Sequence, residues 1–426
     1  MAIDFDAVIT NPRLRQLFAE QEERRKAYPP ESNLLPHETF WRDHQVWLQK
    51  RGYMLRPRYH PDWVPSSLSR SKKGIIGPED ACVAVKGHLL DARKISTGEK
   101  VMLKRILKSQ HPYEVDIHKY LTTGGLASHP QNHCAPLYEV LQSPYDEDVV
   151  LLVLPLYRKF HSPSFVTVGE IVEFFRQIFK ASPKVFSFTF PLLTIRYLQG
   201  LRFIHQCGVA HRDCGYMNIM MDPRDLYPDG FHPMSQILDA AWTPALAKHS
   251  TRTRAPVKYY FIDFGISCAF DPADTEPLAI PIRAGDKSAP DFTDDSLIPI
   301  NPFPTDVYYI GNLIRMDIME VQYMCLYGVD CVHLRQDVQQ YRRIDFMGPL
   351  IEDMVQADPT KRPNMDVVVE RFEYIRRSLP WWKLRRRLRL REEDGAPILS
   401  FVRDVRQFFH TLCDIVMSHS AIPTCK

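Results

Sequence analysis

The chain has 426 residues, of which 45% are hydrophobic and 25% are charged, an ordinary composition for a globular protein with two lobes or two to three small domains. Its formal net charge of +3 is too small to indicate a nucleic-acid partner. The nine cysteines include no C-x-x-C pair, so the sequence indicates neither a zinc site nor a disulfide framework. The apolar runs are too short to span a bilayer and the N-terminus lacks a signal-peptide core, so we expect a cytoplasmic or nuclear protein.

Residues 1–80 predict an N-terminal extension that packs on the domain after it. Between Pro36 and Leu48, apolar and aromatic side chains recur at helical spacing, which is typical of an amphipathic helix. These side chains are Phe40, Trp41, Val46, Trp47 and Leu48. Proline-punctuated extended chain and then a polar loop are expected to complete the extension.

The next part predicts a small sheet with one main helix. Strands are expected at Ala81–Val85, His88–Ile95, Val101–Ile106, Asn132–Leu141 and Val149–Leu154. The polar residues 96–100 predict a hairpin turn between the second and third of these strands. A helix pattern that begins with a proline follows at His111–Leu121.

The remainder of the chain predicts mostly helices. Val168–Phe179 and Phe401–Met417 have amphipathic patterns, and Asp222–Val257 is typical of a long surface insertion. The basic run Trp381–Arg391 predicts a solvated helix face with its leucines directed inward, namely Leu384, Leu388 and Leu390. A nuclear-import signal or a patch for an anionic surface is the alternative interpretation of this run.

Two short polar motifs border apolar runs in the middle of the chain. His211–Asn218 is a polar loop, and Asp263 follows the buried-strand pattern Tyr259–Ile262. Phosphoryl transfer needs one carboxylate to take or orient the proton of the nucleophile, and an Asp with an Asn to hold Mg²⁺ against the phosphates. Asp213, Asn218 and Asp263 are candidates for these roles, and capping residues of two turns are the alternative.

The order H-R-D-x-x-x-x-N followed by Asp263-Phe-Gly resembles the protein kinase signature. The resemblance implies that Asp213 orients or deprotonates the substrate hydroxyl, and that Asn218 and Asp263 bind Mg²⁺. It also implies that Lys104 holds the α- and β-phosphates of ATP and is fixed by Glu114. Arg212 would face a phosphorylated residue of the activation segment, for which Thr275 and Ser288 are the candidates.

Three further residues extend the resemblance. Asp291 ends an A-P-D triplet that resembles the kinase A-P-E, and Arg362 is its expected partner. Asp306 resembles the helix aspartate that braces the catalytic loop. Flanking sequences resemble kinase-like proteins of basidiomycete fungi. The family implies an α+β, bilobal protein-kinase-like fold with a small antiparallel β-sheet N-lobe carrying one main helix, a larger mostly helical C-lobe, and MgATP in the cleft.

The resemblance divides the chain into four expected parts. An N-terminal extension, 1–80, packs on the kinase domain, and 81–157 forms the N-lobe and hinge. Residues 158–377 form the C-lobe, and 378–426 form a C-terminal helical extension. We expect a protein kinase that phosphorylates serine or threonine of an unknown protein substrate, with ATP and Mg²⁺ as cofactors and without a membrane span.

Two departures from the kinase pattern keep other functions open. No G-x-G-x-x-G precedes Lys104, so backbone cover of the phosphates is looser or built differently. Gly215 stands where serine/threonine kinases carry a phosphate-contacting lysine. Losing one such cation typically lowers the rate by about 10²–10³-fold. The alternatives are therefore a weak or inactive pseudokinase that acts as a nucleotide-binding scaffold, and a small-molecule kinase.

Residues 180–199 interrupt a helix pattern that otherwise leads straight into the catalytic loop. Pro183 and Pro191 each break a helix at a cost of about 3 kcal/mol, and the stretch has no acidic residue. Its 20 residues correspond to an insert that keeps the reading frame. We predict that the segment is a translated intron outside the working fold. The alternative is a genuine variable loop that caps a bent helix.

Overall fold

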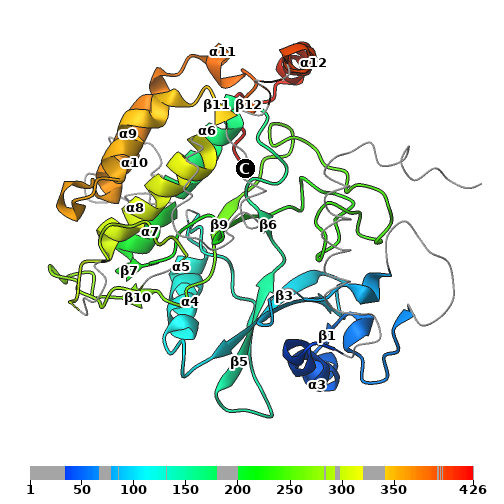
Figure 1. The fold of residues 1–426 in the computed structure, drawn as a ribbon. Coiled ribbons are helices and arrows are strands. Elements are labelled where there is room, and N and C mark those ends of the chain that lie inside the picture. The colour runs from blue at the N-terminus through cyan, green and yellow to red at the C-terminus, as the bar shows by residue number, and fades with distance from the viewer. Residues whose placement is uncertain are drawn as a thin grey trace, which may run out of the picture. The chain divides into compact units, whose positions relative to one another are not determined.

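The computed structural model describes residues 34–66, 78–84, 86–130, 132–179, 200–282, 285–292, 298–319, 341–390, 393, 395 and 397–425. These residues fall into two units, each of which is described by itself. Unit 1 takes in the described parts of Met1–Ile106, with Glu139–Leu156 and Asp229–Lys248. Unit 2 takes in those of Leu107–Tyr138, Tyr157–Pro228 and His249–Lys426. Helices and antiparallel sheets occur together, as the expected α+β class requires (Figure 1).

Unit 1 is built around a five-stranded sheet with the order β1-β2-β3-β5-β4. Its strands are β1 (Tyr53–Met54), β2 (Leu89–Lys94), β3 (Lys100–Leu107), β4 (Glu139–Gln142) and β5 (Val149–Pro155). β1 pairs antiparallel with β2, β2 with β3, and β4 with β5. The predicted hairpin between β2 and β3 is confirmed. β1 comes from the expected N-terminal extension, so the extension supplies an edge strand of this sheet.

Helix α3 (Pro36–Lys50) packs on the sheet, which confirms the prediction that it covers another element. Trp41 and Leu48 are fully buried in the core of unit 1, among strand residues such as Leu103. The Trp41 indole N–H donates to the carbonyl of Gly87, at 3.1 Å. A Cβ atom on Gly87 would lie 2.8 Å from the Cβ of His37. Gly87 therefore allows close approach of the helix.

Two strand predictions are wrong. The strand expected at Ala81–Val85 does not form within the described residues, and the strand expected at Asn132–Leu141 begins only at Glu139. Glu79–Ala81 is a 3₁₀ turn (η3), and residues 82–84 join no strand. The carbonyl of Ala84 instead lies 2.8 Å from the His37 side chain, so side chains take the place of a strand partner. Between 132 and 138 the chain makes a single bridge, Cys134 with Phe261. Pro136 within this stretch lacks the N–H that a ladder needs.

Unit 2 holds most of the described helices. They are α4 (Glu114–Thr122), α5 (Gly124–Ala127), α6 (Val168–Phe179), α7 (Gly200–Gln206), α8 (Phe303–Leu313), α9 (Gly348–Met354), α10 (Met365–Ser378), α11 (Trp381–Leu384) and α12 (Pro397–Val416). Single-turn or irregular helices are η1 (Pro57–Tyr59) in unit 1, and η4 (Ile314–Met319), η6 (Asp345–Met347) and η7 (Pro359–Lys361) in unit 2.

The strands of unit 2 are short and form three small sheets within the described residues. One sheet has the order β6-β8-β9, with β6 at Arg158–Lys159, β8 at Ile219–Met221 and β9 at Tyr259–Phe261. The others pair β7 (Val209–Ala210) with β10 (Cys268–Ala269), and β11 (Tyr341–Arg342) with β12 (Arg389–Leu390). All of the pairs with a known register are antiparallel.

The helix predicted at Val168–Phe179 is confirmed as α6, but it is buried on nearly every side. The polar side chains of α6 are buried because they form hydrogen bonds with the backbone of residues 253–259. The Glu170 carboxylate accepts the N–H of Thr253 at 2.9 Å, and the Gln177 side chain bonds both Val257 and Tyr259 backbone. The amphipathic pattern therefore belongs to a buried helix, in which hydrogen bonds satisfy these buried polar side chains.

Two other expectations for the second half of the chain are corrected. The predicted surface insertion, Asp222–Val257, is partly buried, because Leu226 and Val257 pack inside and Arg252 donates to the carbonyls of Phe160 and Pro163. The basic run is not one helix, since α11 ends at Leu384 and the chain then enters β12. Its Leu384 and Leu388 do point inward, as predicted.

The cysteines of the described residues are all free, while Cys325 and Cys331 lie outside those residues. Among the helices that the structure describes, none combines the length and the apolar character needed to cross a membrane. The predicted intron, residues 180–199, also lies outside the described part of the chain.

Candidate functional site

The pairing of two strands in unit 2 brings the candidate polar residues together. Asn218 immediately precedes β8, and Asp263 comes two residues after β9. Because the two strands are antiparallel, the start of one and the end of the other share an end of the sheet. The N–H of Ile262 donates to the carbonyl of Asn218 at 3.0 Å, which closes this end. Asp213 joins them through its contact with Asn218.

Asp306 of α8 holds the loop that carries Asp213. Its carboxylate is fully buried and accepts the backbone N–H of His211 at 2.7 Å and that of Arg212 at 2.6 Å. A charged acceptor strengthens such bonds and fixes the path of the backbone. The His205 side chain lies 3.0 Å from the same carboxylate. The expectation that Asp306 braces this loop is confirmed.

Both carboxylate oxygens of Asp213 have partners. The amide nitrogen of Asn218 donates to Oδ2 at 2.8 Å, and the backbone N–H of Gly285 donates to Oδ1 at 3.3 Å. Burial raises the pKa of Asp213 above its ordinary value, and the nearby charge of Asp263 adds to the effect. His211 and the two hydrogen bonds act in the opposite direction without reversing it. A carboxylate with a raised pKa is a better proton acceptor near neutral pH.

The side chain of His211, the first residue of the loop, is fully buried and supports the shape of the loop. Its Nε2 lies 3.1 Å from the carbonyl of Ile262, and its Nδ1 accepts the N–H of Asp213 at 3.3 Å. The two bonds fit one neutral tautomer, with the proton on Nε2. Desolvation lowers the pKa of His211, which agrees with a neutral ring. His211 is therefore a positioning residue between the two motifs.

Two residues of the motifs adopt the left-handed backbone region. Arg212 has φ of 67° and Asp263 has φ of 66°. Outside glycine this region costs energy and is held only where the surrounding contacts determine it, which is common at functional sites. The Asp263 Oδ1 atom accepts the N–H of Gly265 at 3.2 Å, so the side chain stabilises its own turn.

Glu114 and Phe264 connect helix α4 with this turn. Glu114 is the first residue of α4 and is almost fully buried. A Cβ atom on Gly265 would lie 3.1 Å from Glu114 Oε2, so the carboxylate lies directly against the Asp263-Phe-Gly turn. The buried Phe264 ring lies 5.1 Å from the ring of His118 in α4 and 5.1 Å from that of His211.

Lys104 belongs to unit 1. It lies in β3 opposite Leu89 and is 8% exposed, which places it inside the sheet region rather than in a solvated edge position. Its expected ion pair with Glu114 of unit 2 stays a prediction.

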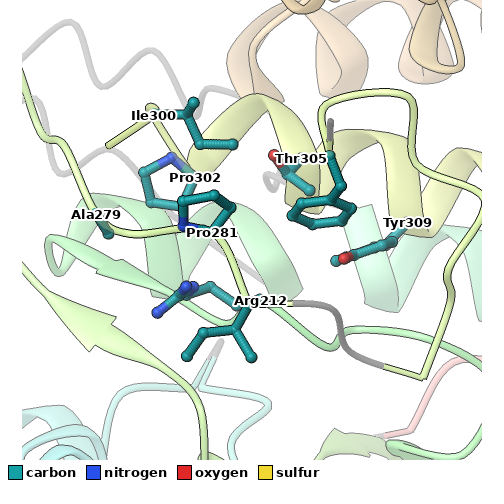
Figure 2. A pocket seen from close by; sticks show the side chains of 9 residues that line it. Arg212, Ala279, Pro281, Ile300, Pro302, Thr305 and Tyr309 are labelled. Atoms are coloured by element: carbon teal, nitrogen blue, oxygen red, sulfur yellow. The ribbon is translucent and has the colours of Figure 1, made fainter. Parts of the chain in front are cut away.

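The surroundings of Arg212 differ from those of a simple phosphate-binding arginine. Its guanidinium donates to the carbonyl oxygens of Ile266, at 3.3 Å, and Ile280. Figure 2 shows the side chain at one side of a pocket lined by apolar residues such as Pro281 and Ile300. Of its two candidate phosphorylation sites, Ser288 bonds Asp286 at 2.7 Å. A phosphate there would meet a like charge, so Ser288 is the weaker candidate.

Asp291 and Arg362 form the ion pair that the sequence predicted. Both guanidinium bonds to the carboxylate measure 2.7 Å. The Thr305 hydroxyl also donates to Asp291, at 2.9 Å. The shorter aspartate therefore reaches its partner with bidentate geometry.

The two sequence departures have clear structural settings. Gly87 lies against His37 of α3, where a Cβ atom would not fit, while Gly74 and Gly77 lie outside the described residues. At Gly215 an added Cβ would meet no atom within 4 Å. A lysine would fit this position, and its absence is not imposed by packing.

Sequence reasoning missed the contact between Gly285 and Asp213. The signal that could have found it is the position of Gly285, six residues before Asp291 in the segment that follows Gly265. In the part of the chain that the structure describes, no group of three or more His, Cys, Asp or Glu residues is placed to hold a metal ion.

A scan of the sequence against protein-family models found no matching family, and a search of curated proteins found no match.

Proposed function

We propose that the chain is a protein kinase with the bilobal fold, which transfers the γ-phosphoryl group of ATP to a serine or threonine hydroxyl of a protein. The observation that carries the proposal is the convergence of Asp213, Asn218 and Asp263 at one end of the β8–β9 pair. These three side chains provide a proton acceptor and two oxygen ligands for a cation, which is the set that phosphoryl transfer requires.

Asp213 is the proposed catalytic base. The substrate hydroxyl oxygen would form a bond to the γ-phosphorus while the bond from that phosphorus to the bridging oxygen breaks. The hydroxyl proton passes to Asp213, and ADP leaves. The raised pKa of Asp213 favours proton acceptance, and Asn218 keeps the carboxylate in position through its 2.8 Å bond.

Asn218 and Asp263 are the proposed ligands of Mg²⁺, which would neutralise charge on the phosphates. The amide nitrogen of Asn218 is used in bonds to the Asp213 carbonyl and carboxylate, so its amide oxygen is the atom left for a cation. Two protein oxygen ligands suit Mg²⁺, which usually takes its remaining ligands from water and substrate phosphates. Lys104 and Glu114 are the proposed phosphate-binding pair.

A catalytically weak or inactive pseudokinase is the second candidate. It is favoured by the lack of a G-x-G-x-x-G motif before Lys104 and by the lack of a cation at Gly215. The paired Asp291 and Arg362 support a protein substrate over a small molecule, because this pair anchors the segment that resembles the kinase activation segment.

A phosphorylation assay with radiolabelled ATP on the purified chain tests the proposal, with Asp213→Asn as the control. Transfer to serine or threonine of a generic protein substrate by the wild type alone supports it. Equal labelling by both proteins would assign the signal to a contaminant. If neither protein transfers phosphate, a thermal-shift titration with MgATP decides between the candidates. A response that Asp263→Asn weakens supports the pseudokinase, and no response up to millimolar MgATP excludes both.

A further inference from the structure

Helix α12, at the end of the chain beside β12 (Figure 1), is attached to unit 2 by its polar side. Asp404 accepts a hydrogen bond from Arg387 at 2.6 Å, and Asp414 accepts one from Arg254 at 2.8 Å. Ser400 and Asp414 are each 5% exposed. Among the side chains of α12 that the structure describes, those that attach the helix thus do so through ion pairs and hydrogen bonds, whereas most surface helices pack through an apolar stripe.

The apolar side of α12 is open to solvent. Six of its side chains follow one another at intervals of four and three residues, namely Ile398, Val402, Val405, Phe409, Leu412 and Val416. Their exposed fractions run from 40% to 84%. This spacing repeats every seven residues, as in the a and d positions of helices that pack along each other.

A second row widens this surface. Phe401, Phe408 and Ile415 lie seven residues apart beside the first row, and Phe401 is 67% exposed. We call these nine side chains the α12 stripe. None of the nine is charged. Arg406 borders the stripe on the side away from Ser400, as the helical period requires. Arg403 lies nearer to Asp414, and its guanidinium donates to Glu393 at 2.8 Å.

The size of the stripe is that of a protein interface. Three of the nine side chains are phenylalanines, each of which has ~150–250 Å² of surface when fully exposed, and the six aliphatic side chains are smaller. At exposed fractions of 40% to 84%, the nine together present on the order of 1,000 Å² of apolar surface. The largest apolar patch on a typical monomer covers about 300–600 Å². A stable interface buries about 800 Å² on each partner, which the stripe alone can supply.

We propose that the α12 stripe is a self-association surface, which a second copy of this chain covers by packing its own α12 along it. A twofold interface places the same patch on both partners, so the patch must complement itself. An uncharged apolar stripe meets this condition, because no like charges meet across its centre. The heptad spacing suits a helix as the opposing element.

Sedimentation velocity on the full chain at micromolar concentrations tests this proposal. The wild type is expected to be a dimer. The double variant Val402→Glu with Phe409→Glu should raise the dissociation constant at least about 100-fold, because each copy would bring two unpaired charges into an apolar interface. Both side chains are more than half exposed, so the variant should fold, which circular dichroism and its unfolding temperature check.

Tyr374→Glu is the matched control. Tyr374 is a large hydrophobic residue of α10 that is 78% exposed. It lies outside the α12 stripe, so this variant should remain dimeric. A dimer that resists the double variant, or a wild type that is monomeric throughout, overturns the proposal. A monomer that binds phosphatidylserine vesicles through Val402 and Phe409 would assign the stripe to a membrane surface. A monomer that dimerises only after deletion of residues 1–33 would assign it to the chain's own N-terminal segment.

Discussion

Arg362 donates two hydrogen bonds of 2.7 Å to the carboxylate of Asp291, 71 residues earlier in the chain, and both side chains are at most 2% exposed. The pair therefore joins the end of the segment after Gly265 to the turn before α10 inside unit 2. A buried pair of this kind is satisfied on both sides, so removing one partner leaves the other charge without compensation.

We expect Asp291→Ala to destabilise the protein by about 3–5 kcal/mol, which is typical for breaking a buried ion pair. Chemical denaturation with a probe in unit 2 measures the change. Asp353→Ala is the control, because Asp353 pairs with Arg371 at a largely exposed site and should cost at most about 1 kcal/mol. If both substitutions lowered the free energy of unfolding equally, the buried pair of Arg362 with Asp291 would contribute no more than the exposed pair.

Glu38→Ala should destabilise unit 1 by about 3–5 kcal/mol, because it leaves the buried Arg58 unpaired. Asp43→Ala breaks an exposed pair on the same helix and should cost at most about 1 kcal/mol. Burial is the largest single effect on the pKa of Glu38 and would raise it, but the hydrogen bonds from Arg58, the Leu35 N–H and Tyr59, together with the charge of Arg58, outweigh burial and lower the pKa. The contribution is therefore present at neutral pH and is lost as the pH falls through the lowered pKa of the folded state. Denaturation at pH 7 and in acid measures both effects. A wild type that loses no stability in acid relative to Glu38→Ala would contradict the assignment.

Asp213→Asn should reduce kcat by about 10²–10⁴-fold, the usual contribution of a general base, with ATP affinity within a few-fold of the wild type. The wild-type kcat/KM, which reports the free enzyme, should also fall in acid at a pH above the ordinary aspartate value, because burial raises the pKa of Asp213 in the free protein and only the ionised form accepts a proton. A pH–rate profile from steady-state assays measures this limb. A profile that is flat down to the ordinary aspartate pKa would remove Asp213 from the role of base.

Gly215→Lys should raise kcat, if the chain is a kinase, by up to about 10²–10³-fold, because it restores a cation near the transferred phosphate. The open space at the Cβ position of Gly215 indicates that the fold accepts the side chain. Gly215→Gln provides similar length without the charge and should give no comparable gain. If both variants match the wild type in single-turnover assays, the missing lysine does not limit the rate.

Deleting Lys180–Gln199 should raise the soluble yield and the unfolding temperature. The ends of the segment already lie together, because a Cβ atom on Gly200 would come within 2.3 Å of the Ile178 carbonyl oxygen at the end of α6. Gly200 begins α7 with φ of 60°, so it must return to helical φ for α6 and α7 to join, which a glycine does without steric cost. A serine- and glycine-rich replacement of equal length separates the effect of sequence from that of chain length. A deletion that no longer folds, with transcripts that retain these codons, would establish the segment as a genuine loop.

Local patterns in the sequence determined several elements correctly. The 3.6-residue period of Pro36–Leu48 predicts α3, and the turn residues 96–100 predict the β2–β3 hairpin. Asp306 and the Asp291–Arg362 pair followed from a resemblance in motif order, and the structure confirms both. These features depend on residues whose roles are set by near neighbours or by one specific partner.

Only the tertiary structure decided which side of an amphipathic helix is covered. The patterns of α6 and α12 both predict one apolar and one polar side, yet α6 is buried on nearly every side and α12 is attached through its polar side. The sequence cannot distinguish these cases, because the period shows which side is apolar but not what lies opposite it. Distant partners decide that, such as Thr253 for Glu170 and Arg254 for Asp414.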